Sequence, residues 1–476
     1  MSTSRDEPTT TAGEAGSGGL DRAITRNMLL VFVIGDVLGA GIYALVGEVG
    51  GRVGGAIWTA FAVALLLAVF TAFAYAELVT KYPQAAGAAL YVNKAFRQPF
   101  FSFMVAFAVM ASGITSAATL ARAFGGDYLD AFVSLPTVLV GIAFLLVIAL
   151  INARGIKESV RLNLVLTVIE VSGLLLVVVI AIAALADGQG DPGRAFEFKE
   201  GESVIGAMLG GAALAFFALI GFEDSVNVAE EAKDPRHSFP RALFGGLLVA
   251  GAIYLTVTIL ASMVVPTDVL AESDGPLQTV AGTGPLAVDE KVFSAIALFA
   301  LANGALINMV MASRLLYGMS NEGILPSVLG GIGSRRTPLL AIAFTTLLAI
   351  ILVTTGDLGD LADMTVTLLL LVFITVNISV LVLRKDEVGH DHFRTPSWIP
   401  VVGIGVCILL LTYRDGEVFL RSAILLGFGA LLYVVNRLLT GPGGPLDTRR
   451  LEAAAHPDLG PATGAGAVRR ERQHPR

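Results

Sequence analysis

Charge is scarce in this sequence. Asp, Glu, Lys and Arg together make up 15% of its 476 residues, whereas an ordinary soluble domain carries about 25%. Hydrophobic residues make up 55%, more than a compact water-soluble fold can bury, because much of its surface must face water. The composition excludes a soluble enzyme, a nucleic-acid-binding protein and a disordered chain. It predicts a membrane protein, with apolar residues for on the order of a dozen helices at ~20 residues each.

Residues that bind metals or carry out catalysis are also rare. The single cysteine, Cys407, allows neither an internal disulfide nor a cysteine-based metal site. His390 and His392 flank an aspartate in a polar loop, which we interpret as a solvated loop and not as a metal site. The sequence contains no phosphate-binding loop and no Ser/His/Asp set. We therefore expect no metal, no cofactor, no ATP-driven pumping and no enzymatic activity.

Long apolar runs bounded by charges or turn residues predict twelve membrane spans. They lie at 27–48, 55–80, 99–124, 131–151, 162–187, 203–229, 241–264, 291–317, 338–355, 361–383, 398–413 and 417–439. Residues 1–19 lack the apolar core of a signal peptide, so we expect the first span to be retained as a signal anchor. The tails at 1–20 and 441–476 are rich in Gly, Pro, Ala and charge, and we expect both to be disordered and cytoplasmic.

Lys and Arg alternate between loops as the positive-inside rule requires. With the N-terminus inside, 25 of the 32 Lys and Arg residues fall in inner segments and 7 in outer ones. A missed span would scramble this alternation in every loop that follows. We therefore predict a multi-pass protein of the cell membrane, surrounded by lipid, with both termini in the cytoplasm. The outer loop at 265–290 is long enough for a short helix that acts as a lid, although a plain linker fits it equally well.

Two of the predicted spans are interrupted. The first contains Gly39 and Gly41 close to Asp36, and the sixth contains Gly221 followed by Glu223. Irregular backbone at membrane depth is tolerated only where a cavity or a ligand uses the freed N–H and C=O groups. Free amides suit an anion and free carbonyls suit a cation, so two such breaks can hold a zwitterion. Alternatively, the glycines merely permit tight helix packing.

At these residues the chain resembles the amino acid–polyamine–organocation (APC) superfamily of permeases. The resemblance is carried by Gly39-Ala40-Gly41-Ile42-Tyr43, by Tyr75-Ala76-Glu77-Leu78 with the segment 82–92, by Phe217-Ala218-Leu219-Ile220-Gly221-Phe222-Glu223 with Pro235 and Pro240, and by the segment 314–326. Together these motifs extend over roughly residues 27–440. The resemblance implies an all-α membrane fold of the LeuT type, in which helices one and six are discontinuous.

The same resemblance implies how the twelve helices are organised. Two inverted repeats of five helices would occupy about 27–187 and 203–383, and two extra helices would follow at 398–439. All of them would belong to one permease domain at 21–440. The period of five spans that separates the two interrupted helices agrees with such a 5+5 repeat.

The resemblance also implies a binding site for an amino acid or a related amine. Its carboxylate would meet the amides of Ala40, Gly41 and Ile42. Its ammonium group would meet backbone carbonyls, which belong to Val37, Phe217, Ala218 and Ile220. Phe217 matches the position of an aromatic gate that closes over the substrate from outside, although a lipid-facing or core phenylalanine is the alternative.

Acids within the spans are candidates for coupling transport to protons, because a charge at bilayer depth is costly. The segment 157–163 resembles the start of the fifth helix in the cationic-amino-acid-transporter branch, where a lysine follows seven residues later. This chain has Glu170 at that position, ~13 Å into the span at ~1.5 Å per residue. Glu170 is therefore our first candidate for a proton carrier, and Glu223 and Asp36 are weaker ones. Each of the three has a purely structural alternative, and Glu77 is expected to make a helix-end contact.

The sequence thus predicts a secondary active amino acid permease, with proton-coupled import by alternating access. A polyamine or organic-amine transporter, or an amino acid exchanger of the same superfamily, remains the alternative. An intramembrane enzyme or a channel is disfavoured, because the spans contain only scattered acids and no repeated pore motif.

Overall fold

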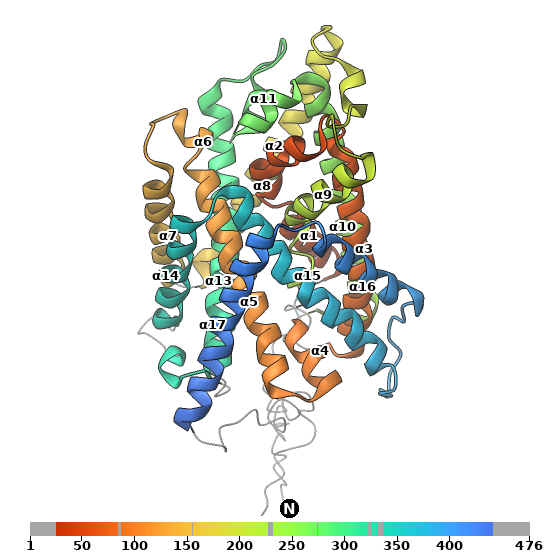
Figure 1. The fold of residues 1–476 in the computed structure, drawn as a ribbon, viewed down its shortest axis with the longest axis vertical. Helices are drawn as coiled ribbons and strands as arrows, with labels where there is room; N and C mark the ends of the chain where they lie inside the picture. Colours follow the sequence, from red (N-terminus) through yellow and green to blue (C-terminus); the bar gives the residue numbers. More distant parts are fainter. Residues whose placement is uncertain are drawn as a thin grey trace, which may run out of the picture.

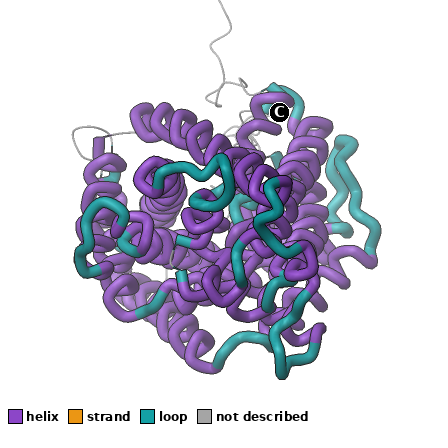
Figure 2. The backbone as a smooth tube through the Cα atoms, turned by 90° about the horizontal axis from the view of Figure 1, so that it is seen from above, coloured by secondary structure: helices purple, strands orange, loops and turns teal. Residues whose placement is uncertain are grey.

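The computed structural model describes residues 25–83, 87–154, 156–226, 232–273, 275–321, 325–331 and 337–440. Both predicted tails lie outside these residues. Within them the chain is helical and forms no strand (Figures 1 and 2). The α-helices are α1 Arg26–Val37, α2 Gly41–Val53, α3 Ile57–Lys81, α4 Gly87–Phe96, α5 Pro99–Phe124, α6 Asp127–Asp130, α7 Thr137–Arg154, α8 Ile156–Ala186, α9 Val204–Ala215, α10 Pro235–Val264, α11 Thr267–Glu272, α12 Pro276–Ala281, α13 Glu290–Asn321, α14 Leu339–Thr355, α15 Leu358–Leu383, α16 Trp398–Leu411 and α17 Gly416–Thr440.

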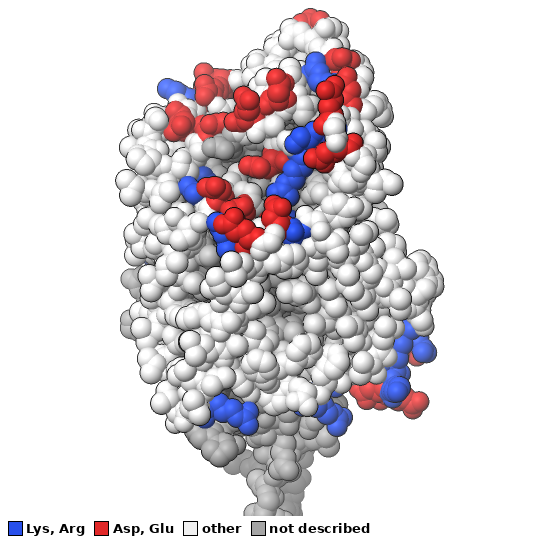
Figure 3. Space-filling view, in the orientation of Figure 1, with Lys and Arg blue, Asp and Glu red and all other residues white. Residues whose placement is uncertain are grey.

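Many of these helices are long and apolar enough to cross a membrane. Among the described residues, 9 helices meet that condition, and the bent pair α1–α2 makes a tenth. Two further apolar helices, α14 and α16, are shorter, with 17 and 14 residues. On the face drawn in Figure 3, charged side chains gather around a hollow at the upper end and along the lower edge, and the band between them is nearly free of charge. The chain is therefore a multi-pass membrane protein.

Most helix bounds agree with the predicted spans to within four residues, but the starts of α7, α8 and α10 and the end of α2 differ by five or six. The fourth span was expected from residue 131, but α7 starts at Thr137, directly after Pro136. Proline has no N–H to donate and disfavours a helical conformation at the residue before it, so a helix that began earlier would be interrupted at this position. The seventh was expected from residue 241, but α10 starts at Pro235, a residue whose fixed φ suits the first turn of a helix. Hydropathy detects apolar runs, so it missed this polar first turn.

The helices form a buried centre and a lipid-facing periphery. Helix α5 packs against α13 and α15, and α10 packs against α1 and α3. Peripheral helices α7 and α17 instead expose large apolar side chains, among them Leu146, Leu150, Leu431 and Leu438. Exposed leucines in this number are stable only against an apolar solvent. The periphery is thus built for lipid.

At the lower end of the bundle, the segment between α15 and α16 is fastened to α3. Glu77 accepts a hydrogen bond from the Thr395 N–H at 2.8 Å and forms an ion pair with Arg384 at 3.2 Å. The Thr80 hydroxyl accepts the Phe393 N–H at 3.0 Å. Both ends of the Glu77 pair are largely buried, with side chains 3% and 14% exposed. Glu77 therefore makes the helix-end contact that its position predicted.

Glu77→Gln removes the negative charge that Arg384 and the Thr395 N–H share. Since it leaves a buried guanidinium without its counter-ion, we expect the free energy of unfolding to fall by about 3 kcal/mol. Denaturant unfolding of the purified protein in detergent measures this loss. The control Glu417→Gln removes a 69% exposed partner of Arg421, and we expect it to change the same free energy by less than about 0.5 kcal/mol. Equal losses in the two variants would contradict the assignment.

Candidate binding site

The first span is bent at Leu38–Ala40. Helix α1 ends at Val37, α2 begins at Gly41, and the two axes differ by 44°. The first N–H groups of a helix have no acceptor within that helix. The amides of Gly41 and Ile42 therefore point out of the N-terminus of α2, at the depth where the two helices meet. This arrangement suits a negative charge.

The sixth span loses its regular helix in the same region. Helix α9 ends at Ala215, a short 3-10 turn follows (η2, Phe216–Leu219), and Ile220 is extended. Gly221 then adopts a φ of +126°, which favours glycine because side chains are strained there. The Gly221 N–H donates to the Glu223 carboxylate at 2.9 Å. One of the freed backbone groups is thus satisfied by a side chain two residues away.

The two interruptions touch each other. A Cβ on Gly41 would lie 2.7 Å from the Cα of Ala218 and 3.1 Å from the ring of Phe217. A Cβ on Gly221 would lie 2.5 Å from the backbone oxygen of Asp36. Only glycine permits these approaches, because a side chain at either position would collide with backbone atoms. By contrast, the nearest atom to a Cβ on Gly39 would be 3.6 Å away, an ordinary contact.

All seven predicted substrate-binding residues lie at this junction. Six are buried or belong to the contact itself: Val37, Ala40, Gly41, Ile42, Phe217 and Ala218. The seventh, Ile220, is partly buried. Phe217 is only 5% exposed, so it does not face lipid. A Cβ on Gly304 of α13 would lie 3.2 Å from the Cβ of Ala40, which brings a third element against the break.

The carbonyl of Val37 is already engaged. It accepts the Gly39 N–H at 2.8 Å and the Tyr254 hydroxyl at 2.7 Å. A carbonyl oxygen has two lone pairs, so this one has no capacity left for a ligand in this arrangement. Tyr254 of α10 thus replaces the helical partner that the break removed.

Two of the three predicted acids come together at the junction. Asp36 interacts electrostatically with Glu223 and with Asp224, which sequence reasoning did not select. Asp36 Oδ2 is buried and has no hydrogen-bond partner among the described residues. The arrangement therefore gathers three acidic side chains at the junction of the broken helices.

The third acid, Glu170, lies in a separate group. Its side chain is fully buried in α8, and Oε2 accepts a hydrogen bond from Asn303 of α13 at 3.3 Å. The Asn303 amide also donates to the Thr167 hydroxyl at 3.2 Å, and Tyr43 of α2 donates to the backbone oxygen of Glu170 at 2.6 Å. Glu170 Oε1 and Asn303 Oδ1 are buried without a partner in the described part of the chain. A proton on Glu170 would turn one of its carboxylate oxygens into a donor.

Other polar residues of α13 differ in their partners. Asn308 donates to the Gly304 oxygen of its own helix at 2.9 Å. Ser313 instead accepts a hydrogen bond from Asn152 of α7 at 3.1 Å. Only the second of these bonds crosses between helices.

An ion cluster that was not expected from the sequence lies on the α2 side of the junction. Asp363 of α15 is 2% exposed and binds Arg52, at the end of α2, at 2.8 Å. Its other oxygen binds Arg414, from the turn between α16 and α17. Asp363 was not selected from the sequence because it stands near the start of its span, where an acid ordinarily meets water.

Loops of the same end cover α2. The predicted loop 265–290 contains the two short helices α11 and α12, which contact α2, and α12 also contacts α8. A Cβ on Gly47 of α2 would collide with the Leu270 oxygen. The loop at 188–202 is joined to α2 by the Lys199 N–H, which donates to the Val53 oxygen at 2.8 Å. Both loops therefore pack on the half-helix that begins at the break.

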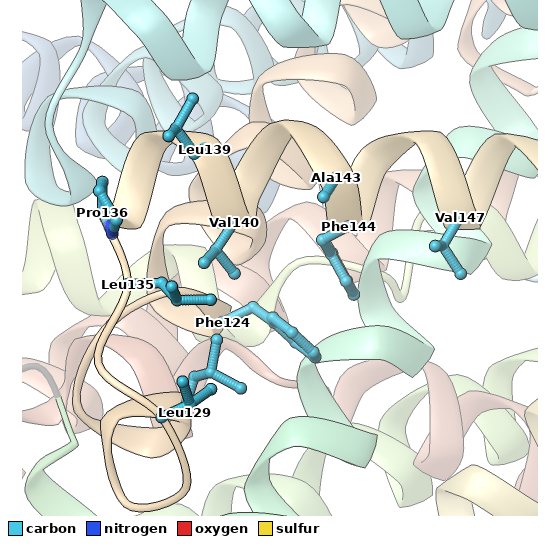
Figure 4. A pocket seen from close by; sticks show the side chains of 10 residues that line it. Phe124, Leu129, Leu135, Pro136, Leu139, Val140, Ala143, Phe144 and Val147 are labelled. Carbon is cyan, nitrogen blue, oxygen red and sulfur yellow. The ribbon is translucent and has the colours of Figure 1, made fainter.

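An apolar groove elsewhere on the surface has a different character. It has a volume of about 560 Å³ and is lined only by apolar side chains. Figure 4 shows Val140 and Phe144 of α7 pointing into it, opposite Phe124, Leu129 and Leu135. It offers no partner for a charged or polar group, so it is not a site for a zwitterion. Among the described residues, no group of three His, Cys, Asp or Glu side chains is arranged to hold a metal ion.

Comparison with known proteins identifies relatives along nearly the whole chain. The sequence profile of the amino acid permease family matches residues 27–425. The branched-chain amino acid permease BcaP of Bacillus subtilis (strain 168) is 25% identical over 447 residues, which cover 89% of this chain and 94% of that protein. The methylthioribose transporter of the same organism is 26% identical, with 89% and 95% coverage.

A plant transporter is also similar. The vacuolar cationic amino acid transporter 2 of Arabidopsis thaliana is 30% identical over 407 residues. The match covers 81% of this chain and 63% of the longer plant protein. The names of these relatives therefore span neutral amino acids, cationic amino acids and a sugar derivative, while all describe permeases or transporters.

The contact between the two interruptions can be tested at glycine. Gly41→Ala forces a methyl group against the backbone of Ala218, so we expect a loss of about 1–3 kcal/mol in the free energy of unfolding. The matched variant Gly39→Ala adds the same methyl group two residues earlier without a close contact, and we expect no loss. Unfolding of both purified variants in detergent measures the difference. Similar stability of the two variants would argue against the contact.

Proposed function

The chain belongs to the amino acid permease family, and we propose that it is a secondary active transporter that imports amino acids by alternating access. The observation that carries this proposal is the contact of two interrupted helices at Gly41 and Gly221. It brings the N-terminus of one half-helix and the free carbonyls of another to one point. An α-amino acid carries the opposite charges that these two helix ends attract.

The architecture we propose is a twelve-helix domain at 21–440. It counts the bent pair α1–α2 as the first span, α9 with η2 as the sixth, and the shorter helices α14 and α16 as further spans. The two inverted repeats would occupy 27–187 and 203–383, followed by the hairpin at 398–439. The distribution of Lys and Arg supports cytoplasmic termini and the cell membrane as its location. The α6–α11 end would then face outward.

In the proposed site, the substrate carboxylate binds the amides of Ala40, Gly41 and Ile42 at the start of α2. The ammonium group binds the carbonyls of Ala218 and Ile220. The carbonyl of Phe217 contributes less, since the Ile220 N–H already occupies it at 3.4 Å, and that of Val37 does not contribute in this arrangement, since two donors occupy it. Phe217 closes the site from the outer side. Its burial beside Gly41 supports this role.

The proposed coupling ion is a proton, and Glu170 carries it. The support is chemical: among the described residues, the fully buried carboxyl group has an amide side chain as its hydrogen-bond partner, and one oxygen of each group lacks a donor. Protonation removes the charge and supplies that donor. The Tyr43 hydroxyl links the Glu170 backbone to α2. The protonation state of Glu170 can thereby influence the half-helix that binds the substrate.

A transporter for organic amines is the second candidate. It is favoured by the group of Asp36, Glu223 and Asp224, which would attract an additional positive charge on the substrate. The same acids are also secondary candidates for proton transfer. An exchanger with the same binding site would differ only in its coupling.

Substrate analogues separate the first two candidates. Because helix amides recognise the carboxylate, we expect free amino acids to raise the melting temperature of the purified protein. Their methyl esters and the matching decarboxylated amines should raise it far less. A thermal-shift screen with leucine, lysine, their esters and cadaverine makes the measurement. Equal stabilisation by lysine and cadaverine would instead support the amine transporter.

Glu170→Gln tests the proton carrier. Proteoliposomes with an imposed proton gradient should accumulate labelled amino acid with the wild-type protein. The Gln variant should only equilibrate it, and its uptake should lose the pH dependence, since an amide cannot release a proton. The control Glu290→Gln changes an exposed acid at the start of α13 and should behave as the wild type. Unchanged accumulation and pH dependence in Glu170→Gln would refute the carrier.

A further inference from the structure

The guanidinium group of Arg414 is fully buried, although the residue lies in a turn. That turn joins α16 and α17, the two helices that fall outside the proposed inverted repeats. The side chain is 0% exposed and meets the 2% exposed carboxylate of Asp363. A guanidinium group is seldom buried without several partners, because the loss of hydration is costly. Its partners therefore indicate what the burial achieves.

Arg414 joins two elements that are not neighbours in sequence. One nitrogen donates to Asp363 of α15, and another donates to the backbone oxygen of Ala213 in α9. Ala213 stands in the last turn of α9, just before the 3-10 turn, where helix carbonyls lose their intrahelical donors. Arg414 thus satisfies the end of an interrupted helix from outside.

The second interrupted helix is held at the same carboxylate. Arg52 at the end of α2 binds the remaining oxygen of Asp363 at 2.8 Å. Helix α15 packs against both α16 and α17, so Arg414 and Asp363 belong to one packed block. The half-helix α2 is attached to this block through Arg52, and the half-helix α9 is attached to it through Arg414. If α2 and α9 move away from α15, the contacts of Arg52 with Asp363 and of Arg414 with Ala213 must break, while the pair of Arg414 and Asp363 remains.

We infer that Arg414 is a positioning residue for the transport cycle, which holds the outer half of the interrupted sixth helix against α15 when the outer side is closed. The inference rests on the proposed function. When α2 withdraws, Arg414 also remains as the counter-ion of Asp363. The hairpin α16–α17, which carries Arg414, thereby takes part in closing the outer side and is not only a lipid-facing element of the periphery.

The chemistry favours arginine at this position. Its planar fork presents several N–H donors in fixed directions, so one group can bind a carboxylate and a carbonyl at once. Lysine, as a compact charge, would not reproduce both directions. Loss of the side chain leaves the Ala213 oxygen and one Asp363 oxygen without donors in the closed arrangement. Water supplies those donors only when the outer side is open. Loss of the Arg414 side chain therefore shifts the equilibrium between the closed and the open arrangement toward the open one.

Hydrogen–deuterium exchange of the purified protein tests the inference without relying on transport. In Arg414→Met we expect amides of α9 and α2 to exchange about tenfold faster than in the wild type, which corresponds to about 1.4 kcal/mol. Amides of α5 and α17 should not change. The matched control Arg421→Met removes a charge from the same hairpin, but the partners of Arg421 among the described residues are Asp360 and Glu417, which lie outside α2 and α9. It should leave α9 and α2 unchanged.

Three results would overturn the inference: unchanged exchange in Arg414→Met, faster exchange in every helix, or the same acceleration in Arg421→Met. If Arg414→Met does not yield folded protein, Arg414→Gln replaces it. This variant keeps a polar side chain that cannot bridge both acceptors, and the same local acceleration is expected.

Uptake kinetics give a second readout that a purely structural defect would not produce. With labelled leucine or lysine added outside proteoliposomes, Arg414→Met should lower both KM and kcat, because the outward-open form becomes more populated and closure becomes harder. An unchanged KM with a reduced kcat would contradict the inference. If the wild-type protein transports neither probe, the proposed function fails, and the exchange measurement still decides the role of Arg414.

Discussion

Backbone that leaves the helical conformation inside a membrane must find new partners for its N–H and C=O groups, and this requirement governs the centre of the protein. Three such groups next to the breaks are satisfied by side chains. Tyr254 donates to the Val37 carbonyl, Glu223 accepts the Gly221 N–H, and Arg414 donates to the Ala213 carbonyl. Each of these residues permits an irregular segment that would otherwise be too costly. The amides at the start of α2 and the carbonyls of Ala218 and Ile220 are the groups that the proposed substrate would satisfy.

Some of the buried side-chain atoms that have no hydrogen-bond partner among the described residues lie where the proposed transport takes place. Asp36 Oδ2 lies at the junction of the two breaks, and Glu170 Oε1 lies beside Asn303 on the α8–α13 contact. A buried acceptor without a donor is costly, and at these two places a ligand or a proton would supply the missing partner for part of the proposed cycle. The two locations thus separate the proposed substrate site from the proposed coupling site, while Tyr43 connects them through α2.

Much of the fold could be predicted from the sequence because hydropathy reports directly on lipid exposure. The main errors occurred where another rule applied: Pro136 delays the start of α7, and Pro235 starts α10 within a polar segment. At the site, glycine spacing pointed to the correct region but not to the role of each glycine. Gly41 and Gly221 stand at close contacts between backbones, whereas Gly39 does not. Likewise, the motif could not reveal that Tyr254 occupies the Val37 carbonyl.

The sequence by itself determined the class of protein, the approximate helices and the positions of the breaks. The reason is that these features depend on local properties: an apolar run decides which segment lies in lipid, and a cluster of glycines decides where the backbone can leave the helical conformation. Only the tertiary structure decided which polar groups meet. Arg52 and Asp363 are 311 positions apart, and Arg414 and Ala213 are 201 apart. Such pairs depend on how whole helices pack, and the low polarity of the surroundings then requires each buried charge to have a partner.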